Sequence, residues 1–438
     1  MGNKISSFSV SMSAKKWGRN CPIYLHKALS LTVFFFLEFL EAILCIVYRF
    51  LDRFIEGKSS SCYCGNKNPR NSKLKEESES LYDRRNIFSK MYFFGILRKW
   101  IDSNNNINHS VGKCVRNRWS DCNCESCISW TKHGSDKLHV VISQPSTGSN
   151  TEKPIENVIF IHGLFSSSSF WTKSVFPNLS ETTKQSYRLF AIDLLGFGDS
   201  PKPMDCLYTL KDNLEMIENS VINPYELQSF HLVAHSMGCI IALALASKYS
   251  NIIKSVTLVA PACFPHYNKL GGDLEVLKRV AIQRIWPPAV FVGAVASWYE
   301  HLSRSLHFII LRHHQTWEKL LKLLSNREPS NGMKDFTKHT HHSIWHTTHN
   351  VLYGGAKFVD EYLEILKESR AKISIMQGDR DKYVPVDCSY YIKQKIPRAD
   401  LNIIPNATHN SVIFQRKKEF IQNLERLWAS SLAVKSSM

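Results

Sequence analysis

Three residue types that together perform nucleophilic acyl chemistry occur in the order serine, acid, histidine. The serine, Ser236, stands in "AHSMG" (234–238), where an apolar, β-branched run stops and an Ala/Leu-rich helical run begins. This resembles the G-x-S-x-G nucleophile elbow, with alanine in place of the first glycine. A strand that turns at once into a helix lifts the serine oxygen clear of the sheet. A serine that only caps the helix is the alternative interpretation.

The acid and the histidine follow later strands. Asp381 lies in "GDRDKYVP" after a predicted strand that ends at Gly378, and Asp379 is a competing candidate; either could merely cap the next helix. His409 lies in "NIIPNATHNSVI", just past the last predicted strand. Because carboxyl ends of parallel strands share one edge of a sheet, we predict a Ser236, Asp381, His409 triad there.

An early strand supplies the remaining requirement, donors for a developing oxyanion. "FIHGLF" (160–165) ends this strand with His162 and Gly163, and the glycine lets the backbone turn inward. We predict that the amides of Leu164 and Met237 form the oxyanion hole, while His162 packs the loop.

This chemistry predicts an enzyme that forms an acyl-serine from an ester and needs no cofactor or metal. Water as acceptor makes it a hydrolase, and an alcohol makes it an acyltransferase. A ligand receptor on a hydrolase scaffold, with incidental turnover, is the rival from another class. Serine rather than aspartate at the elbow argues against epoxide-hydrolase and dehalogenase chemistry.

The elements that must position these residues lie in a predicted domain over 136–430. Short apolar runs, most of them separated by helical stretches, predict an α/β-hydrolase fold with a mostly parallel sheet and helices on both faces. The strand pattern is interrupted over about 262–354. We interpret this insertion as a mainly helical cap whose aromatic residues suit a lipid-like acyl chain. In its stretch 339–349, the spacing of His342, His346 and His349 could align metal ligands on one helix face. Packed or solvent-facing roles are favoured for all five histidines of this stretch: His339, His341, His342, His346 and His349.

The N-terminal region, 1–60, predicts membrane association. Of the formal net charge of +17, most precedes residue 136, and no nucleic-acid motif accompanies it, so we expect no nucleic-acid partner. The apolar run 29–50, interrupted by Glu38 and Glu41, suits a signal anchor, a cleaved signal or an interfacial helix. Five basic residues and no acidic residue precede this run, whereas the charges just after it nearly cancel, which favours a catalytic domain outside the cytoplasm. In contrast, "MGNKIS" fits N-myristoylation of Gly2, which would keep the chain cytosolic. Cys45 could also carry an acyl chain.

The segment 61–135 is rich in cysteine. Its six cysteines are Cys62, Cys64, Cys114, Cys122, Cys124 and Cys127. The spacing C-x-C-x2-C is not the usual paired zinc pattern and no histidine pair lies nearby, so disulfides are favoured over a metal if the segment is outside the cytosol.

Several motifs together resemble one family. "VIFIHGLFSSSSFW", "FAIDLLGFGDSPKP", "HLVAHSMGC", "HTHHSIWHTTHN" and "RWSDCNCESCISW" are similar to the plant Bodyguard proteins, α/β-hydrolases described as probable lysophospholipases. The similarity spans nearly the whole chain. It implies an enzyme anchored at the cell membrane or secreted to the cell wall of the epidermis, acting on lipid or polyester substrates in cuticle and cutin formation. By motif match, Ser236, Asp381 and His409 take the triad roles.

Overall fold

The computed structural model describes residues 32–57, 88, 96–97, 118–125, 127–128, 136–145, 155–263, 299–325 and 331–432. The chain divides into two compact units. The first comprises 1–68, 80–109 and 270–303, and the second comprises 69–79, 110–269 and 304–438. The sheet, the predicted triad and most of the cap lie in the second unit.

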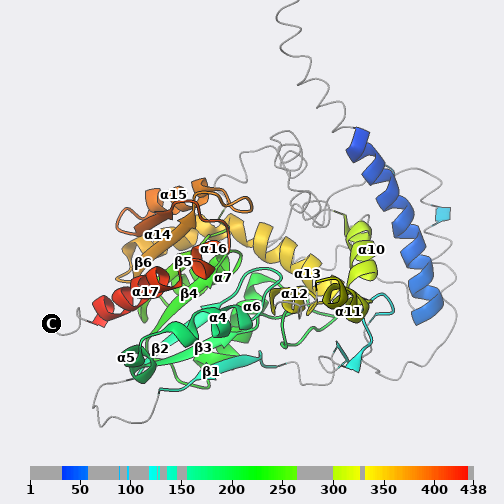
Figure 1. The fold of residues 1–438 in the computed structure, drawn as a ribbon. Coiled ribbons are helices and arrows are strands. Elements are labelled where there is room, and N and C mark those ends of the chain that lie inside the picture. Colours follow the sequence, from blue (N-terminus) through cyan, green and yellow to red (C-terminus); the bar gives the residue numbers. More distant parts are fainter. Residues whose placement is uncertain are drawn as a thin grey trace, which may run out of the picture. The chain divides into compact units, whose positions relative to one another are not determined.

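A seven-stranded sheet forms the centre of the second unit, in the order β1-β3-β2-β4-β5-β6-β7 (Figure 1). The strands are β1 (Val140–Ser143), β2 (Glu156–Ile161), β3 (Tyr187–Ile192), β4 (Phe230–His235), β5 (Ile253–Val259), β6 (Lys372–Gly378) and β7 (Asp400–Ile404). Only β1 pairs antiparallel, with β3. The predicted α/β-hydrolase fold is therefore confirmed, with β4 between β2 and β5.

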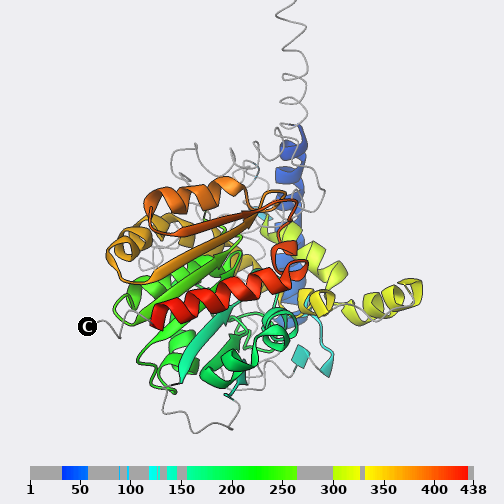
Figure 2. The ribbon, with the colours of Figure 1, turned by 60° about the vertical axis from the view of Figure 1, so that its left-hand side comes forward.

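The sheet is buried on both faces because successive residues of its strands enter different cores. In β2, Ile159 and Ile161 belong to one hydrophobic cluster and Val158 and Phe160 to the other. The first cluster is closed by α6 (Leu210–Ile217), α7 (Gly238–Lys248), α14 (Val359–Glu368) and α15 (Val386–Lys395). The second is closed by α4 (Ser169–Ser174), α16 (Ser411–Phe414) and α17 (Lys417–Leu432), the red helix in Figure 2. A further short helix, α5 (Glu181–Ser186), leads into β3.

Helices replace strands between β5 and β6. The described ones are α10 (Glu300–Ile310), α11 (His314–Ser325), α12 (Asn331–Phe336), α13 (His341–Thr347), the π-helix η6 (Thr348–Tyr353) and the 3-10 helix η7 (Gly355–Phe358). Trp345 and Tyr299 are buried, whereas Trp317 is exposed. Trp286 and Trp298, which the sequence also placed in this insertion, lie outside the described residues.

The histidines of the cap stretch 339–349 pack within the protein. His339, His341, His346 and His349 are all buried. Burial lowers the pKa of His349 to about 4, and the ring packs against Trp345 with centroids 4.0 Å apart. Burial also lowers the pKa of the other three, so these four side chains are neutral parts of the cap's interior, the packed one of the two roles expected above.

The first unit contains a helix over 32–56. Both glutamates that interrupt its apolar run are buried, and Glu41 accepts hydrogen bonds from the backbone amides of His301 and Leu302, each at 2.9 Å. Cys45 is also fully buried. Among the described helices, none combines the length and the apolar character that a membrane span requires. Gly2 lies outside the described residues.

Candidate active site

The strand-to-helix turn at Ser236 has the backbone of a nucleophile elbow. Ser236 joins β4 to α7 with φ of +54°, a left-handed conformation that is strained for a serine. Its amide donates to the Val259 carbonyl at 2.8 Å, and its carbonyl accepts from the Cys239 amide at 3.0 Å. These bonds tie the turn to β5 and to the first turn of α7, so the strain is held by the surrounding fold.

Small residues flank the elbow for a steric reason. A Cβ on Gly238 would lie 2.4 Å from the His162 carbonyl oxygen, so only glycine fits there without a backbone shift. Ala234, two residues before Ser236, is fully buried in the core, which accommodates its methyl group. The departure from G-x-S-x-G is thus compatible with the turn.

The acid is selected by its hydrogen bonds. Asp381 Oδ2 lies 2.7 Å from Nδ1 of His409 and accepts from Gln377 Nε2 at 3.0 Å. The other oxygen, Oδ1, accepts from the backbone amides of Tyr383 and Val384 at 2.8 and 3.0 Å. A carboxylate held by this many donors is fixed in orientation, and it fixes the imidazole in turn.

The competing carboxylate lies elsewhere. Asp379 is exposed, whereas the side chain of Asp381 has no exposed surface and that of His409 is 13% exposed. The structure therefore places Asp381, and not Asp379, against the histidine. Gln377, which orients Asp381 from within β6, was missed from the sequence because a buried strand glutamine carries no motif.

The histidine loop packs directly on the elbow. The His409 ring lies 4.7 Å, centroid to centroid, from the ring of His235, the residue before Ser236, and the His409 carbonyl is 3.3 Å from His235 Nε2. The same loop also packs against the end of β6, because a Cβ on Gly378 would lie 2.3 Å from the Ala407 carbonyl oxygen. Ser236, Asp381 and His409 thus follow β4, β6 and β7 at one edge of the parallel sheet.

The predicted oxyanion loop lies against the serine. A Cβ on Gly163 would lie 2.9 Å from the Ser236 Cβ, which shows how closely this backbone approaches the nucleophile. Within the part of the chain that the structure describes, the amides of Leu164 and Met237 donate to no backbone carbonyl. Two backbone donors beside the elbow are what stabilisation of a tetrahedral oxyanion requires.

His162 sets the shape of that loop. Its Nδ1 donates to the Gly163 carbonyl at 2.7 Å, because its Nε2 accepts from the Leu194 amide at 3.0 Å. Burial lowers the pKa of this imidazole, which keeps the ring neutral and this single tautomer in place. His162 therefore positions the loop and takes no proton from substrate.

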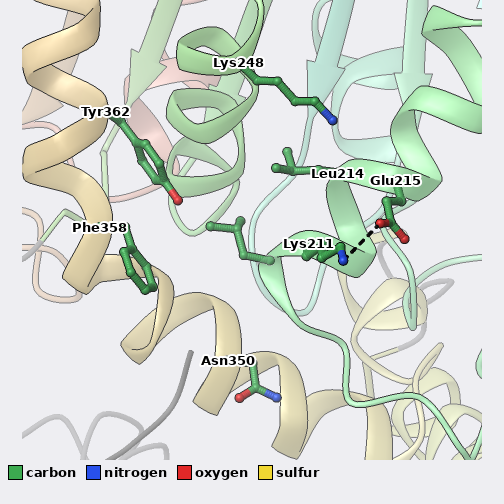
Figure 3. Close-up of a pocket in the computed structure, with 8 residues that line it drawn as sticks. Lys211, Leu214, Glu215, Lys248, Asn350, Phe358 and Tyr362 are labelled. Atoms are coloured by element: carbon green, nitrogen blue, oxygen red, sulfur yellow. Dashed lines mark ion pairs between the residues drawn. The ribbon is translucent and has the colours of Figure 1, made fainter. Parts of the chain in front are cut away.

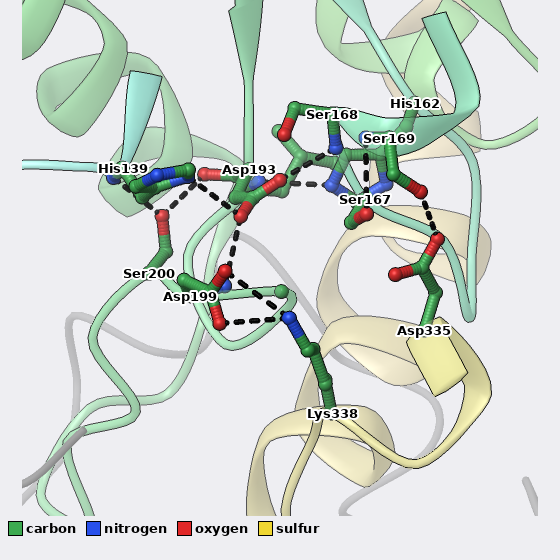
Figure 4. A network of polar contacts seen from close by, with 12 residues as sticks. His139, His162, Ser167, Ser168, Ser169, Asp193, Asp199, Ser200, Asp335 and Lys338 are labelled. Carbon is green, nitrogen blue, oxygen red and sulfur yellow. Dashed lines mark hydrogen bonds and ion pairs between the residues drawn. The ribbon is translucent and has the colours of Figure 1, made fainter. Parts of the chain in front are cut away.

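A second polar network supports the loop and was not predicted from the sequence (Figure 4). Buried Asp193, just after β3, accepts from the Ser168 amide at 2.5 Å, the Asp199 amide at 2.8 Å and His139 Nδ1 at 3.0 Å. Asp199 forms an ion pair with Lys338 of the cap, with 2.9 Å between Nζ and Oδ1. Burial opposes ionisation of Asp193, but these donors prevail and lower its pKa. The available signal was an aspartate directly after a predicted strand in "DLLGFGDS".

The cap reaches the oxyanion loop through aromatic rings. The ring centroid of Phe165 lies 4.8 Å from that of Phe336 in α12 and 5.1 Å from that of His339. The Ser169 hydroxyl also bonds the carboxylate of Asp335. Phe336 and His339 of the cap therefore pack on Phe165, the residue after the predicted oxyanion donor Leu164.

A separate cavity lies on the α6 side of the molecule and contains none of the triad or oxyanion residues (Figure 3). Its volume is about 280 Å³, and its lining is formed by Leu210, Lys211, Leu214, Glu215, Lys248, Asn350, Phe358 and Tyr362. Among the described residues, none of the histidines of the stretch 339–349 belongs to a group of three or more potential metal ligands.

Comparison with known proteins agrees with this geometry. The family model described as the alpha/beta hydrolase fold matches residues 156–415, a range that includes Ser236, Asp381 and His409. Similar curated proteins from Arabidopsis thaliana carry the names "Probable lysophospholipase BODYGUARD 4" and "Probable lysophospholipase BODYGUARD 5". The first is 51% identical over 93% of this chain and 97% of its own length. The second is 46% identical over 96% of this chain and 99% of its own length.

Proposed function

The chain belongs to the α/β-hydrolase fold family and, within it, to the group of BODYGUARD proteins, and from this membership we propose that it cleaves lipid esters of the lysophospholipid or cutin type. The family assignment makes it a serine ester hydrolase. The observation that carries the proposal is the 2.7 Å contact between Asp381 and His409, in a loop packed on the strained Ser236 elbow.

The proposed reaction begins with nucleophilic attack. His409, held in one tautomer because its Nδ1–H is bonded to Asp381, accepts the Ser236 proton at Nε2 while the serine oxygen attacks the ester carbonyl. The carbonyl oxygen gains the negative charge and is stabilised by the amides of Leu164 and Met237. His409 then returns the proton to the leaving alcohol as the carbon–oxygen bond breaks, which leaves an acyl-serine.

Water completes the proposed cycle. His409 takes a proton from a water molecule as the water oxygen attacks the acyl-serine, which forms a second tetrahedral intermediate. His409 then returns the proton to the Ser236 oxygen as the carbon–oxygen bond breaks, which releases the carboxylic acid and restores the serine hydroxyl. The same steps with an alcohol would form a new ester, so an acyltransferase of the cutin-synthase type remains the alternative function. A non-catalytic ligand receptor is the second alternative, and the assembled Asp381–His409 pair argues for the enzyme.

We further propose that the enzyme works at a membrane or cell-wall surface outside the cytoplasm, in cuticle formation. Three features support this: the basic excess before residue 136, the apolar run 29–50, and the near full-length similarity to the BODYGUARD proteins. In this scheme 1–60 associates with the membrane, 61–135 is a cysteine-rich connection, and 136–430 is the catalytic domain.

Labelling with a fluorophosphonate tests the nucleophile. We expect the probe to label the purified wild type and the variant Ser247→Ala, which removes another serine hydroxyl of the adjacent helix α7, but not Ser236→Ala. Turnover of lysophosphatidylcholine should fall about 10⁵-fold in Ser236→Ala, because members of a triad act as a unit. Equal labelling of wild type and Ser236→Ala would refute the assignment.

Product analysis separates the two reactions. With lysophosphatidylcholine and a long-chain alcohol in the same vesicles, the hydrolase releases fatty acid, whereas an acyltransferase forms the alcohol ester. A predominance of the ester would favour the alternative function while leaving the triad assignment intact.

A further inference from the structure

Four potential metal ligands meet outside the active site. Cys122, Cys124 and Cys127, from the cysteine-rich segment, lie beside His314, the first residue of α11. The three sulfurs and one ring nitrogen all lie within 4.8 Å of one another. The four residues belong to the same compact unit, although 187 positions separate Cys127 from His314 along the chain.

The spacing of these atoms matches a tetrahedral zinc site. His314 Nε2 lies 3.4 Å from Cys124 Sγ and 3.6 Å from Cys127 Sγ. With Zn–S of about 2.3 Å and Zn–N of about 2.0 Å, a tetrahedron has a sulfur-to-nitrogen edge of about 3.5 Å and a sulfur-to-sulfur edge of about 3.8 Å. A disulfide joins only two sulfurs and gives the histidine no role, whereas one zinc ion uses all four atoms.

The surroundings orient the histidine for this task. His314 Nδ1 lies 3.0 Å from Oε1 of Glu318, one turn further along α11. A carboxylate on Nδ1 fixes the proton there, so the Nε2 lone pair faces the sulfurs. The Cys124 amide points to Cys122 Sγ at 3.4 Å, a donor that stabilises a ligating thiolate. Both kinds of support are typical of zinc ligands.

We propose that Cys122, Cys124, Cys127 and His314 form a structural Zn²⁺ site that fastens the cysteine-rich segment to the cap. Three thiolates and one imidazole fill the four positions of a tetrahedral zinc ion, which leaves none for water or substrate. The site is therefore structural, and the ester chemistry proceeds without it.

Neighbouring contacts show which elements the ion would fasten. Arg304 Nε, in α10, donates to the Ser120 hydroxyl at 3.0 Å, and its guanidinium lies 5.4 Å from the ring centroid of Trp119. Arg312, just before α11, donates to the Trp119 carbonyl. The segment that carries the cysteines thus runs along the start of the cap helices. An ion at the site would hold α11, and Glu318 in turn accepts from Thr337 after α12, at 3.4 Å.

Elemental analysis of the full-length protein tests the proposal. Protein purified under reducing conditions without chelators should contain about one zinc per chain. Cys124→Ser should retain less than about one tenth of that zinc, because it removes one of the four ligands. The matched control, Cys206→Ser, changes a cysteine of the same unit outside the cluster and should keep the metal in full.

A milder variant covers the case in which Cys124→Ser fails to fold. Glu318→Gln keeps all four ligands, and we expect a zinc affinity about 10- to 100-fold weaker, measured by competition with a chromogenic chelator. Co²⁺ in place of zinc should give the visible bands of a tetrahedral thiolate complex, and these bands should be absent after Cys124→Ser.

Three results would overturn the site. They are wild-type protein without stoichiometric zinc, a Cys124→Ser protein that retains it, and, in protein purified without reductant, an intact mass lower by two hydrogen atoms with a disulfide mapped between two of these cysteines. Metal content is measured independently of ester turnover, so failure of this proposal and failure of the proposed reaction are distinguishable.

Discussion

Replacement of Asp381 by asparagine should move the imidazole proton of His409 from Nδ1 to Nε2, and the hydrogen bonds around Asp381 explain why. Oδ1 of Asp381 accepts from two backbone amides, those of Tyr383 and Val384, so the carbonyl oxygen of an asparagine must occupy that position. The asparagine NH₂ group then faces Nδ1 of His409. It donates where the carboxylate accepted, and the imidazole must carry its proton on Nε2.

This tautomer cannot accept the proton of Ser236. A wrong tautomer in a serine triad lowers kcat by about 10⁴, equivalent to about 5 kcal/mol of transition-state stabilisation. Gln377 Nε2, which donates to Oδ2 in the wild type, opposes this orientation, and its amide is fixed because Nε2 also donates to the Val384 carbonyl at 3.1 Å and Oε1 accepts from Ser389 at 3.0 Å. The two backbone donors at Oδ1 outweigh this single donor. We therefore expect the full loss in Asp381→Asn.

The assay is the initial rate of p-nitrophenyl ester hydrolysis, with the folded fraction checked by circular dichroism. Asp379→Asn is the matched control, because it makes the same chemical change two residues earlier on an exposed side chain. We expect less than a twofold change in the control. If Asp381→Asn retained activity within tenfold of wild type, or if Asp379→Asn lost as much, the assignment of the acid would be refuted.

Two further predictions concern residues that support the predicted oxyanion loop. Gly238→Ala should lower the free energy of unfolding, measured in urea, by about 1–3 kcal/mol and reduce kcat, because the new Cβ would lie 2.4 Å from the His162 carbonyl oxygen. The control Gly332→Ala should change neither quantity, because the space around Gly332 is open. Equal effects of the two substitutions would contradict the steric argument. The hydrogen bond that His139 donates to Asp193 raises the pKa of His139, so its stabilising contribution is complete below an ordinary imidazole pKa and is lost as pH rises through the raised value. The melting temperature should therefore fall between about pH 6 and pH 9 more in wild type than in His139→Asn, and identical pH profiles would contradict this linkage.

Part of this architecture is local and could be predicted from the sequence. The elbow at Ser236 is a short-range event, since an apolar strand meets a helix across one residue with small neighbours. The chain order of Ser236, Asp381 and His409, each after an apolar β-branched run, places all three at one edge of a parallel sheet. The α/β-hydrolase fold follows from the same alternation of strands and helices.

Other features could be decided only by the tertiary structure, because they depend on groups distant in the chain. Asp381 and Asp379 are equivalent as sequence, and only the loop conformation turns one of them toward the buried amides and His409. Glu41 looks like an interruption in a membrane-associated run, yet its carboxylate is buried against the amides of His301 and Leu302.

The cysteine segment gives the clearest case. Its spacing, without a nearby histidine pair, favoured disulfides over a metal. The fold brings His314, which lies 187 positions beyond Cys127, to the three sulfurs. Metal coordination depends on distances in space, and nothing in the local pattern limits how far along the chain the fourth ligand can lie.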